Sequence, residues 1–514
     1  MRREIALLGL IPLLLACSSK EEKRPSSGSS ASFLQSVSSN DDSTVAASSD
    51  EESAASSEIK PSAGLIESSL TLGNTSEFKE SISSKGKGEQ KILVIPCHFK
   101  GEREFASDDV ERIRRAFFDP DLSSSGNCYS LTEFYSASSQ GQLNFSGEVT
   151  SILEVPYTVK EVEDDGNYFP GVPASAFLSS DVSDDFLASY DLNKDGYIDN
   201  AVFVYSTPTS SRSGNFWAWV NTFSSTPNLS RPSFARHMWV GIDNFSEEHY
   251  AIDAHTIIHE AGHLLGLRDY YPSDNYNLAL GGHSMMDYNI SDHDPYSKML
   301  LGWLDPLYYD FSSYNEVTIE LPSFQKDNSC LLFKPNWNHS VMDEYLLFEY
   351  YTPTGLNELD AATQYANRPL GFNESGIKIY HVDSRIAKCK VDSTGNALAF
   401  QEYVNEIPED VDSSTYYVIG ASNSTADSRT DSSRQGRYKQ IALVENKQFN
   451  KLQSGSPADN DSLFQIGDAF DSSDSAYLLK GAWNDKTRIG LKMEVLAMDI
   501  NKATIKLTCD GGSL

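Results

Sequence analysis

The sequence of 514 residues predicts an α+β fold, in which a region of alternating helices and strands precedes a mainly β region. Residues 92–96 form an apolar run typical of a buried strand, and residues 108–118 have the apolar spacing of an amphipathic helix. Further along, short apolar runs separated by turn residues predict strands, including a hairpin over residues 492–508. We therefore expect two folded regions, residues 91–307 and residues 308–514, the second similar to a β-sandwich.

The chain begins with an export signal. Two arginines precede a short apolar stretch, residues 5–15, which is followed by Ala16 and Cys17. This stretch is too short to cross a bilayer as a helix of the mature protein. A small residue directly before a cysteine resembles the lipobox of bacterial lipoproteins, which implies a signal peptide over residues 1–17 and lipidation of Cys17. The alternative is an ordinary secretory signal in which the cysteine is incidental.

Residues 18–90 are rich in Ser, Glu, Lys, Ala and Gly, and their apolar residues are isolated. Such a composition cannot bury enough surface to offset the entropy that is lost on ordering. We expect a flexible, disordered tether here; the alternative is a propeptide with a short ordered segment near residues 64–72. No second apolar run of membrane-spanning length follows, so we expect the mature chain to be anchored to the membrane by lipid alone.

The net charge bears on the class of partner, and the cysteines bear on disulfide bonds. The net charge of −32 argues against nucleic acid, because a protein that binds nucleic acid needs a basic patch to neutralise phosphates. Of the six cysteines, five remain besides Cys17, and their odd number and spacing define no disulfide framework. At most two disulfide bonds are possible, and the sequence does not define their pairing. We expect a monomer.

The strongest chemical signal is the run His-Glu-Ala-Gly-His-Leu-Leu-Gly-Leu-Arg-Asp, which begins at His259. On a helix, His259 and His263 lie on one face, so both imidazoles can bind one zinc ion at about 2.0–2.1 Å. Glu260 would lie beside the open coordination position, as the general base toward a water. Gly266 lets the chain leave the helix in a left-handed conformation, after which Asp269 can return as a third ligand. The alternative is an amphipathic helix with two surface histidines.

A second element follows, in which residues 281–288 read Gly-Gly-His-Ser-Met-Met-Asp-Tyr. This run resembles the Met-turn of metzincin proteases, a tight turn beneath the metal, and Met286 takes the place of the turn methionine. The resemblance aligns Tyr288 with a residue that approaches the zinc, so Tyr288 is a candidate for stabilising the oxyanion. A packed core tyrosine with a satisfied hydroxyl is the alternative.

Together these motifs resemble those of the immune inhibitor A family of bacterial metalloendopeptidases. The resemblance covers about residues 91–382 and also rests on residues 129–135, 141–143, 191–199, 298–303 and 376–383. It implies a metzincin-like catalytic domain over residues 91–307, zinc held by His259, His263 and Asp269, and bound calcium. If the resemblance did not hold, His283 would be the next candidate for the third zinc ligand.

Residues 191–199 follow the first part of an EF-hand calcium loop, because oxygen-bearing residues recur at alternate positions and Gly196 allows a sharp turn. The predicted calcium ligands are Asp191, Asn193, Asp195, Tyr197 and Asp199. The glutamate expected at position twelve is absent, since Val202 stands there. The alternative is an Asx-rich turn without metal. Asp292-His293-Asp294 is another candidate for calcium.

These residues predict a zinc-dependent endopeptidase that hydrolyses extracellular proteins or peptides through a zinc-bound water activated by Glu260. An extended substrate would add as a strand to a sheet edge beside the zinc helix, with residues 237–242 as the candidate edge. We expect the enzyme on the bacterial cell surface, or shed from it. Two rivals are a non-catalytic adhesin or ligand-binding lipoprotein on a protease-like fold, which would not need Glu260, and a zinc hydrolase that acts on other bonds.

Overall fold

The computed structural model describes residues 65–67, 86–164, 171–209, 216–223, 225–271, 279–309, 311, 315–391, 397–405, 408, 414–423, 438–446, 451–477 and 479–510. The predicted signal peptide with Cys17 lies outside the described residues, as does most of the predicted tether. Within the described part of the chain, no helix is long and apolar enough to cross a membrane.

The N-terminal half is built on a six-stranded sheet with the strand order β3-β2-β5-β7-β6, in which β4 also pairs with β2. Its strands are β2 (Gly88–Phe99), β3 (Leu143–Val149), β4 (Leu153–Val155), β5 (Ala201–Tyr205), β6 (Trp219–Thr222) and β7 (Arg236–Gly241). All neighbouring strands run parallel except β6, which is antiparallel to β7. β2 begins before Lys91, the predicted start of order.

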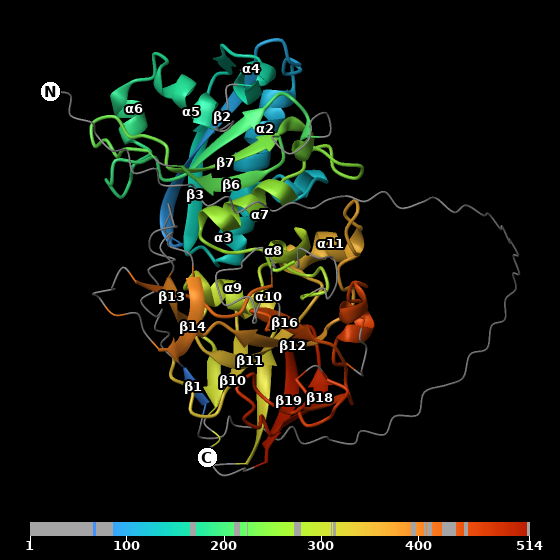
Figure 1. Ribbon diagram of the computed structural model, residues 1–514. Helices are drawn as coiled ribbons and strands as arrows, with labels where there is room; N and C mark the ends of the chain where they lie inside the picture. Colours follow the sequence, from blue (N-terminus) through green and yellow to red (C-terminus); the bar gives the residue numbers. More distant parts are fainter. Residues whose placement is uncertain are drawn as a thin grey trace, which may run out of the picture.

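Helices cover both faces of this sheet (Figure 1). The helices of this half are α2 (Asp109–Phe118), α3 (Leu131–Ser138), α4 (Val159–Asp164), α5 (Gly171–Leu178), α6 (Asp184–Ala188), α7 (His255–Leu264), α8 (Met285–Tyr288) and α9 (Pro295–Leu300). Successive residues of β2 point to opposite faces: Val94 packs in one apolar cluster with α2, α3 and α7, and Ile95 in another with α4, α5 and α6.

The C-terminal half contains three sheets, with the orders β1-β8-β10-β11-β12-β16, β17-β18-β19-β9 and β14-β13-β15. The strands are β1 (Leu65–Glu67), β8 (Leu307–Tyr309), β9 (Glu316–Pro322), β10 (Cys330–Phe333), β11 (Glu344–Tyr351), β12 (Gly376–Asp383), β13 (Ile386–Val391), β14 (Ala397–Val404), β15 (Thr415–Ile419), β16 (Ile441–Val444), β17 (Ala469–Asp471), β18 (Leu491–Met498) and β19 (Lys502–Cys509). Two short helices, α10 (Phe324–Asp327) and α11 (Glu358–Ala362), interrupt them.

The six-stranded and four-stranded sheets of this half pack on one apolar cluster, which includes Leu346 and Phe348 of β11 and Ile505 of β19. This is the sandwich-like packing expected from alternating strands. The predicted hairpin over residues 492–508 is confirmed as β18 and β19. β1, at Leu65–Glu67, lies within the predicted tether and pairs antiparallel with β8.

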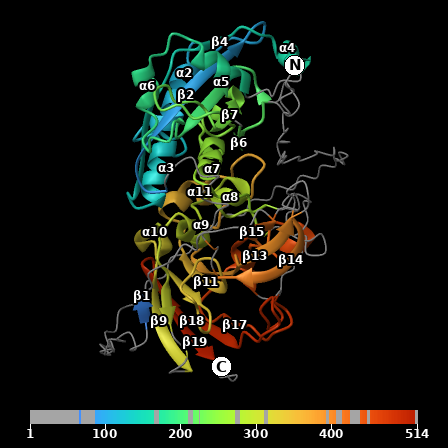
Figure 2. The same ribbon diagram turned by 60° about the vertical axis from the view of Figure 1, so that its left-hand side comes forward.

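The two halves share a core. Leu347 of β11 and Tyr380 of β12 belong to the same apolar cluster as Leu131 of α3 and Ile257 of α7. The N-terminal and C-terminal halves lie one above the other, and α7, α8 and α11 lie where they meet (Figures 1 and 2). The structure is therefore a mixed α/β protein with several sheets, and its zinc motif lies at the joint between two halves.

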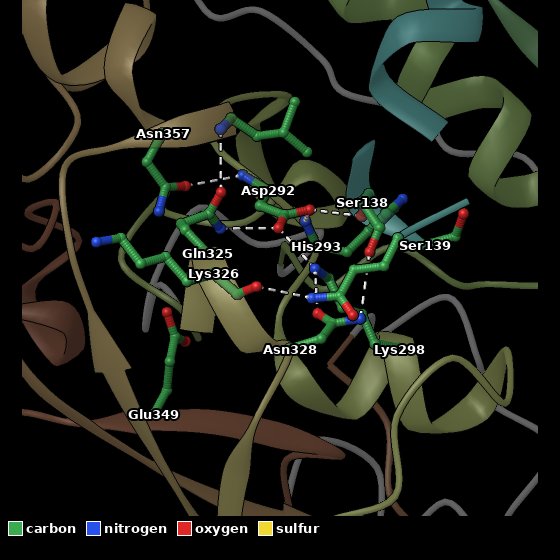
Figure 3. Close-up of polar contacts among 12 residues, drawn as sticks. Ser138, Ser139, Asp292, His293, Lys298, Gln325, Lys326, Asn328, Glu349 and Asn357 are labelled. Atoms are coloured by element: carbon green, nitrogen blue, oxygen red, sulfur yellow. Dashed lines mark hydrogen bonds and ion pairs between the residues drawn. The ribbon is translucent and has the colours of Figure 1, made fainter. Parts of the chain in front are cut away.

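A buried polar network also crosses this joint (Figure 3). Lys298 of α9 donates to Asp292 at 2.6 Å and to Asn328 at 2.8 Å. Ser138 of α3 and Gln325 of α10 donate to the same Asp292 carboxylate, at 2.5 and 2.8 Å. Removing one partner of such a buried ion pair costs about 3–5 kcal/mol. Asp292, considered above for calcium, is thus occupied as a structural anion.

One expectation about the sheet is wrong. Residues 237–242 were expected at a sheet edge, but β7 lies inside the sheet, between β5 and β6. The edge strand on this side is β6, which pairs with β7 alone among the described strands and contacts α7. A local apolar pattern predicts a strand but not its neighbours in the sheet, so it does not distinguish an edge strand from an inner one.

Candidate metal centre

Helix α7 carries the zinc motif. It runs from His255 to Leu264, so His259, Glu260 and His263 all lie on it, as the four-residue spacing predicted. Their candidate ligand atoms lie within 4.8 Å of one another. The helix begins after Ala254, which provides no side-chain cap.

Backbone carbonyls fix the tautomer of both histidines. Nδ1 of His259 lies 2.8 Å from the carbonyl oxygen of Met285, and Nδ1 of His263 lies 2.9 Å from that of Leu267. A carbonyl oxygen can only accept, so each Nδ1 carries the proton and donates it. Each Nε2 is then left with its lone pair, as a metal ligand requires.

Asp269 lies opposite these two lone pairs. Its Oδ1 is 3.0 Å from Nε2 of His259 and 3.2 Å from Nε2 of His263. Ligand atoms on one tetrahedral zinc ion lie about 3.3 Å apart, given bonds of about 2.0–2.1 Å. Gly266 has the predicted positive φ, 97°, which turns the chain back toward the helix. The three side chains therefore fit a zinc ion in both donor type and spacing.

The pKa shifts of His263 and Asp269 indicate that this cluster favours a bound cation. Burial by itself lowers the pKa of His263, but the Asp269 carboxylate outweighs burial and raises that pKa to about 9. Burial likewise opposes ionisation of Asp269, yet His263 and His259 hold its pKa below the ordinary value. Two lone pairs and a carboxylate that converge on one point need a proton or a metal ion between them.

Glu260 has the properties of a general base. It is buried on α7 between the two histidines in sequence. Burial raises its pKa above the ordinary value, although the neighbouring histidines partly offset this effect. A carboxylate with a raised pKa accepts a proton more readily near neutral pH than an exposed one.

The predicted Met-turn packs beneath the helix. A Cβ added to Gly262 would lie 2.4 Å from Sδ of Met286, so the sulfur lies directly against the helix backbone. The carbonyl oxygen of Met286 accepts from the backbone N–H of Tyr270 at 2.8 Å, and the preceding Met285 carbonyl holds His259. The turn thus supports the metal cluster from below through its backbone as well as its side chain.

Tyr288 lies at the end of α8, one ring removed from the cluster. Its ring stacks on Tyr271 with centroids 6.4 Å apart, and the Tyr271 ring lies 6.2 Å from that of His259. Burial raises the pKa of Tyr288, so its hydroxyl keeps its proton at neutral pH. Tyr271 was not predicted as a site residue, although its place directly after the Asp269-Tyr270 pair could have indicated it.

A second group of ligand-type side chains lies around the first residue of α7: His255 begins the helix, and Asp253 and Cys128 lie outside it. All three are buried, with candidate ligand atoms within 4.8 Å of one another. Nδ1 of His255 lies 2.6 Å from Oδ1 of Asp253, and Nε2 lies 3.2 Å from Asp360 of α11. A separation of 2.6 Å is a hydrogen bond and is shorter than the edge of a zinc tetrahedron, about 3.3 Å. Tyr365 donates to the other oxygen of Asp253 at 2.7 Å.

These contacts make His255 a buried imidazolium between two carboxylates. Burial by itself lowers the pKa of His255, but the charges of Asp360 and Asp253 raise it well above the ordinary value. The group therefore joins the start of α7 to α11 of the C-terminal half. The sequence did contain a signal for it, because His255 precedes His259 by one helical turn; Asp360 lies too far along the chain to be predicted.

The five predicted calcium ligands lie in one loop between α6 and β5: Asp191, Asn193, Asp195, Tyr197 and Asp199. Asp191 accepts the N–H of Asp195 at 3.1 Å, Asp195 accepts that of Tyr197 at 2.9 Å, and Asp199 accepts that of Leu192 at 2.7 Å. In the described chain, the three aspartates do not form a group with ligand atoms within 4.8 Å. These are the bonds of an Asx-rich turn, and calcium at this loop stays a prediction.

The remaining expectations concern His283 and the cysteines. His283 stacks on Phe372 with centroids 3.7 Å apart and donates from Nε2 to Ala458 at 3.0 Å. The position beside Nε2 of His259 and His263 is taken by Asp269, while Nε2 of His283 contacts the C-terminal half, so His283 is not an alternative third ligand in this arrangement. The five cysteines other than Cys17 are all free thiols.

The motifs and their geometry are the whole basis for assigning this site. No protein-family model matches the chain, and no curated protein matches it.

Proposed function

We propose that this protein is a zinc-dependent endopeptidase of the immune inhibitor A type. The observation that carries the proposal is the meeting of His259, His263 and Asp269, with both imidazole tautomers fixed so that the lone pairs face the carboxylate. An adhesin built on the same fold would not require Glu260 beside these ligands.

His259, His263 and Asp269 would hold the ion. Bound zinc supplies the Lewis acidity that makes water nucleophilic at neutral pH and polarises a peptide carbonyl. Glu260 accepts the proton of the attacking water on its carboxylate and passes it to the leaving amine nitrogen. The hydroxyl of Tyr288 donates a hydrogen bond to the substrate carbonyl oxygen as negative charge develops there.

The substrate would bind along β6. This strand contacts the zinc helix, and among the described strands it pairs with β7 alone, so an extended peptide would add at its other edge. Strand addition forms hydrogen bonds with the backbone of the peptide and does not depend on its side chains, which suits an enzyme that cleaves many proteins.

The type of catalytic domain, the location of the protein and the calcium site are proposed mainly from sequence motifs. A metzincin-like catalytic domain is supported by the order of the zinc helix, the turn at Gly266 and the Met-turn at Met286. Lipidation of Cys17 would place the enzyme on the bacterial cell surface, where it meets extracellular proteins or peptides as a monomer. Calcium in the loop that begins at Asp191 would have a structural role.

The test is casein hydrolysis by the full chain and by a Glu260→Ala variant, with zinc measured in both samples. We expect cleavage that a chelator abolishes and added zinc restores, and its loss in a variant that keeps its zinc. Zinc in both proteins without cleavage by either would contradict the endopeptidase and favour the ligand-binding lipoprotein; absence of zinc from both would contradict the metal site.

A further inference from the structure

Arg368 brings a positive charge to the edge of the candidate metal centre from the C-terminal half. It lies in the loop after α11, and its guanidinium carbon is 5.4 Å from the ring centroid of Tyr288. The next residue, Pro369, packs on the Met-turn, because a Cβ added to Gly282 would lie 2.7 Å from its Cγ. The loop is thus held against the turn that supports the zinc motif.

The guanidinium has no anionic partner among the described residues. Its Nε is buried without a hydrogen-bond partner, while the residue as a whole is partly exposed. By contrast, Arg385 in the same half is bound by both Asp383 and Glu344. In a chain with 73 acidic and 41 basic residues, Arg368 makes no ion pair among the described residues. Burial raises the pKa of the Asp287 carboxyl, and the charge of Arg368 acts on that carboxyl at longer range and lowers its pKa in part. A buried guanidinium N–H without an acceptor is costly unless a ligand supplies one.

The side chains from the metal cluster to Arg368 form a row. Ring centroids are 6.2 Å apart from His259 to Tyr271 and 6.4 Å apart from Tyr271 to Tyr288, and Arg368 follows at 5.4 Å. Arg368 is therefore separated from His259 by two aromatic rings. A group that binds it belongs to a substrate residue that flanks the cleaved bond, and not to the reacting carbonyl.

We propose that Arg368 binds a carboxylate of the substrate and so makes the enzyme selective for acidic peptides; this inference rests on the function proposed above. A planar guanidinium pairs with a carboxylate through two parallel hydrogen bonds, and the Tyr288 ring beneath it holds its plane in place. The carboxylate comes either from an Asp or Glu side chain or from the C-terminus of the peptide.

The test compares peptides that differ only in charge. Internally quenched peptides of one sequence carry Glu, Gln or Lys at each position that flanks the cleaved bond, each with a free or an amidated C-terminus. We expect the wild-type chain to prefer Glu over Gln at one position, or a free over an amidated terminus, by about 10- to 100-fold in kcat/KM. The position of the preference identifies the source of the carboxylate.

Variants of Arg368 then assign the preference. Arg368→Gln should abolish it, Arg368→Lys should retain part of it, and Arg368→Glu should reverse it toward Lys. Arg114→Gln removes an arginine on α2, where Arg114 pairs with Glu111, and should keep the wild-type preference. Wild-type cleavage with equal kcat/KM for the Glu, Gln and Lys peptides and for both kinds of terminus would overturn the inference and leave the proposed function intact.

A binding measurement separates the two proposals. Titration calorimetry of the Glu260→Ala chain, with and without Arg368→Gln, measures the Kd of uncleaved Glu and Gln peptides. Tighter binding of the Glu peptide that Arg368→Gln abolishes supports the carboxylate site, even if the wild-type chain cleaves nothing. If Arg368→Gln lowers thermal stability but changes neither preference nor Kd, Arg368 only packs on Tyr288 and the inference is wrong.

Discussion

Two groups of metal-ligand residue types lie close together, one built on His259 and His263 of α7 and the other on His255 at the start of α7, and they differ in what binds the Nδ1 atoms of their histidines. In the first group, backbone carbonyls bind Nδ1 of His259 and His263, so both Nε2 lone pairs face Asp269. In the second group, Asp253 lies 2.6 Å from Nδ1 of His255 and holds it as an imidazolium. The same residue types therefore fit a metal ion in one place and form a structural ion network in the other.

The largest expected effect is the loss of zinc from the first group only. In His263→Ala a ligand is missing, and we expect zinc content below about one tenth of the wild-type value, with no measurable proteolysis. His255→Gln, about two helical turns earlier on α7, should keep one zinc ion per chain. Elemental analysis after dialysis measures both. Zinc retained in the first variant or lost from the second would reverse the assignment of the two groups.

The second prediction concerns the stability of the structural network. Asp360→Asn leaves the buried His255 imidazolium with one carboxylate, and we expect a loss of about 3–5 kcal/mol in the free energy of unfolding. Urea unfolding in the presence of a chelator measures this loss. Glu358→Gln, an exposed neighbour on α11, is the matched control and should change stability little. Equal stabilities of the two variants would show that the network is not a joint between the halves.

The third prediction is a pH dependence. The folded pKa of His255 is raised above its unfolded value of about 6.5, so its stabilisation is fully present below that pH and is lost as pH rises toward the folded pKa. We expect wild-type stability to fall, relative to His255→Gln, by at most about 1.4 kcal/mol per pH unit above pH 6.5. Unfolding of both proteins between pH 6 and 9 tests this slope, and parallel curves would contradict it.

The smallest effect is expected at Cys128. Its sulfur accepts the backbone N–H of Ala254 at 3.0 Å, a role that a hydroxyl can also fill. Cys128→Ser should therefore lower the free energy of unfolding by only about 1 kcal/mol and leave zinc content unchanged. A decrease in bound zinc in this variant would make Cys128 a metal ligand.

The structural features that depend on the spacing of nearby residues could be predicted from the sequence. The four-residue interval placed His259 and His263 on one helix face, and Gly266 returned the chain so that Asp269 reached them, because one positive φ is enough to reverse it. Short apolar runs between turn residues identified several of the C-terminal strands, and the hairpin of β18 and β19 needed only a turn between two such runs.

What depends on distant packing was not predictable. Asp360 reaches α7 from α11 and Arg368 reaches α8 from the loop after α11, and the residues next to them in sequence do not indicate these contacts. The edge position of β6 is likewise a property of strand order, which a single strand does not encode. The loop that begins at Asp191 shows a third limit, since its spacing suits both calcium and an Asx-rich turn.

The most direct test is the zinc K-edge absorption spectrum of the full chain with zinc bound, recorded with its metal stoichiometry. We predict one zinc ion per chain with only nitrogen and oxygen ligands, at about 2.0–2.2 Å, from His259, His263 and Asp269. A sulfur ligand at about 2.3 Å, or a second equivalent of zinc that Cys128→Ser removes, would contradict the account.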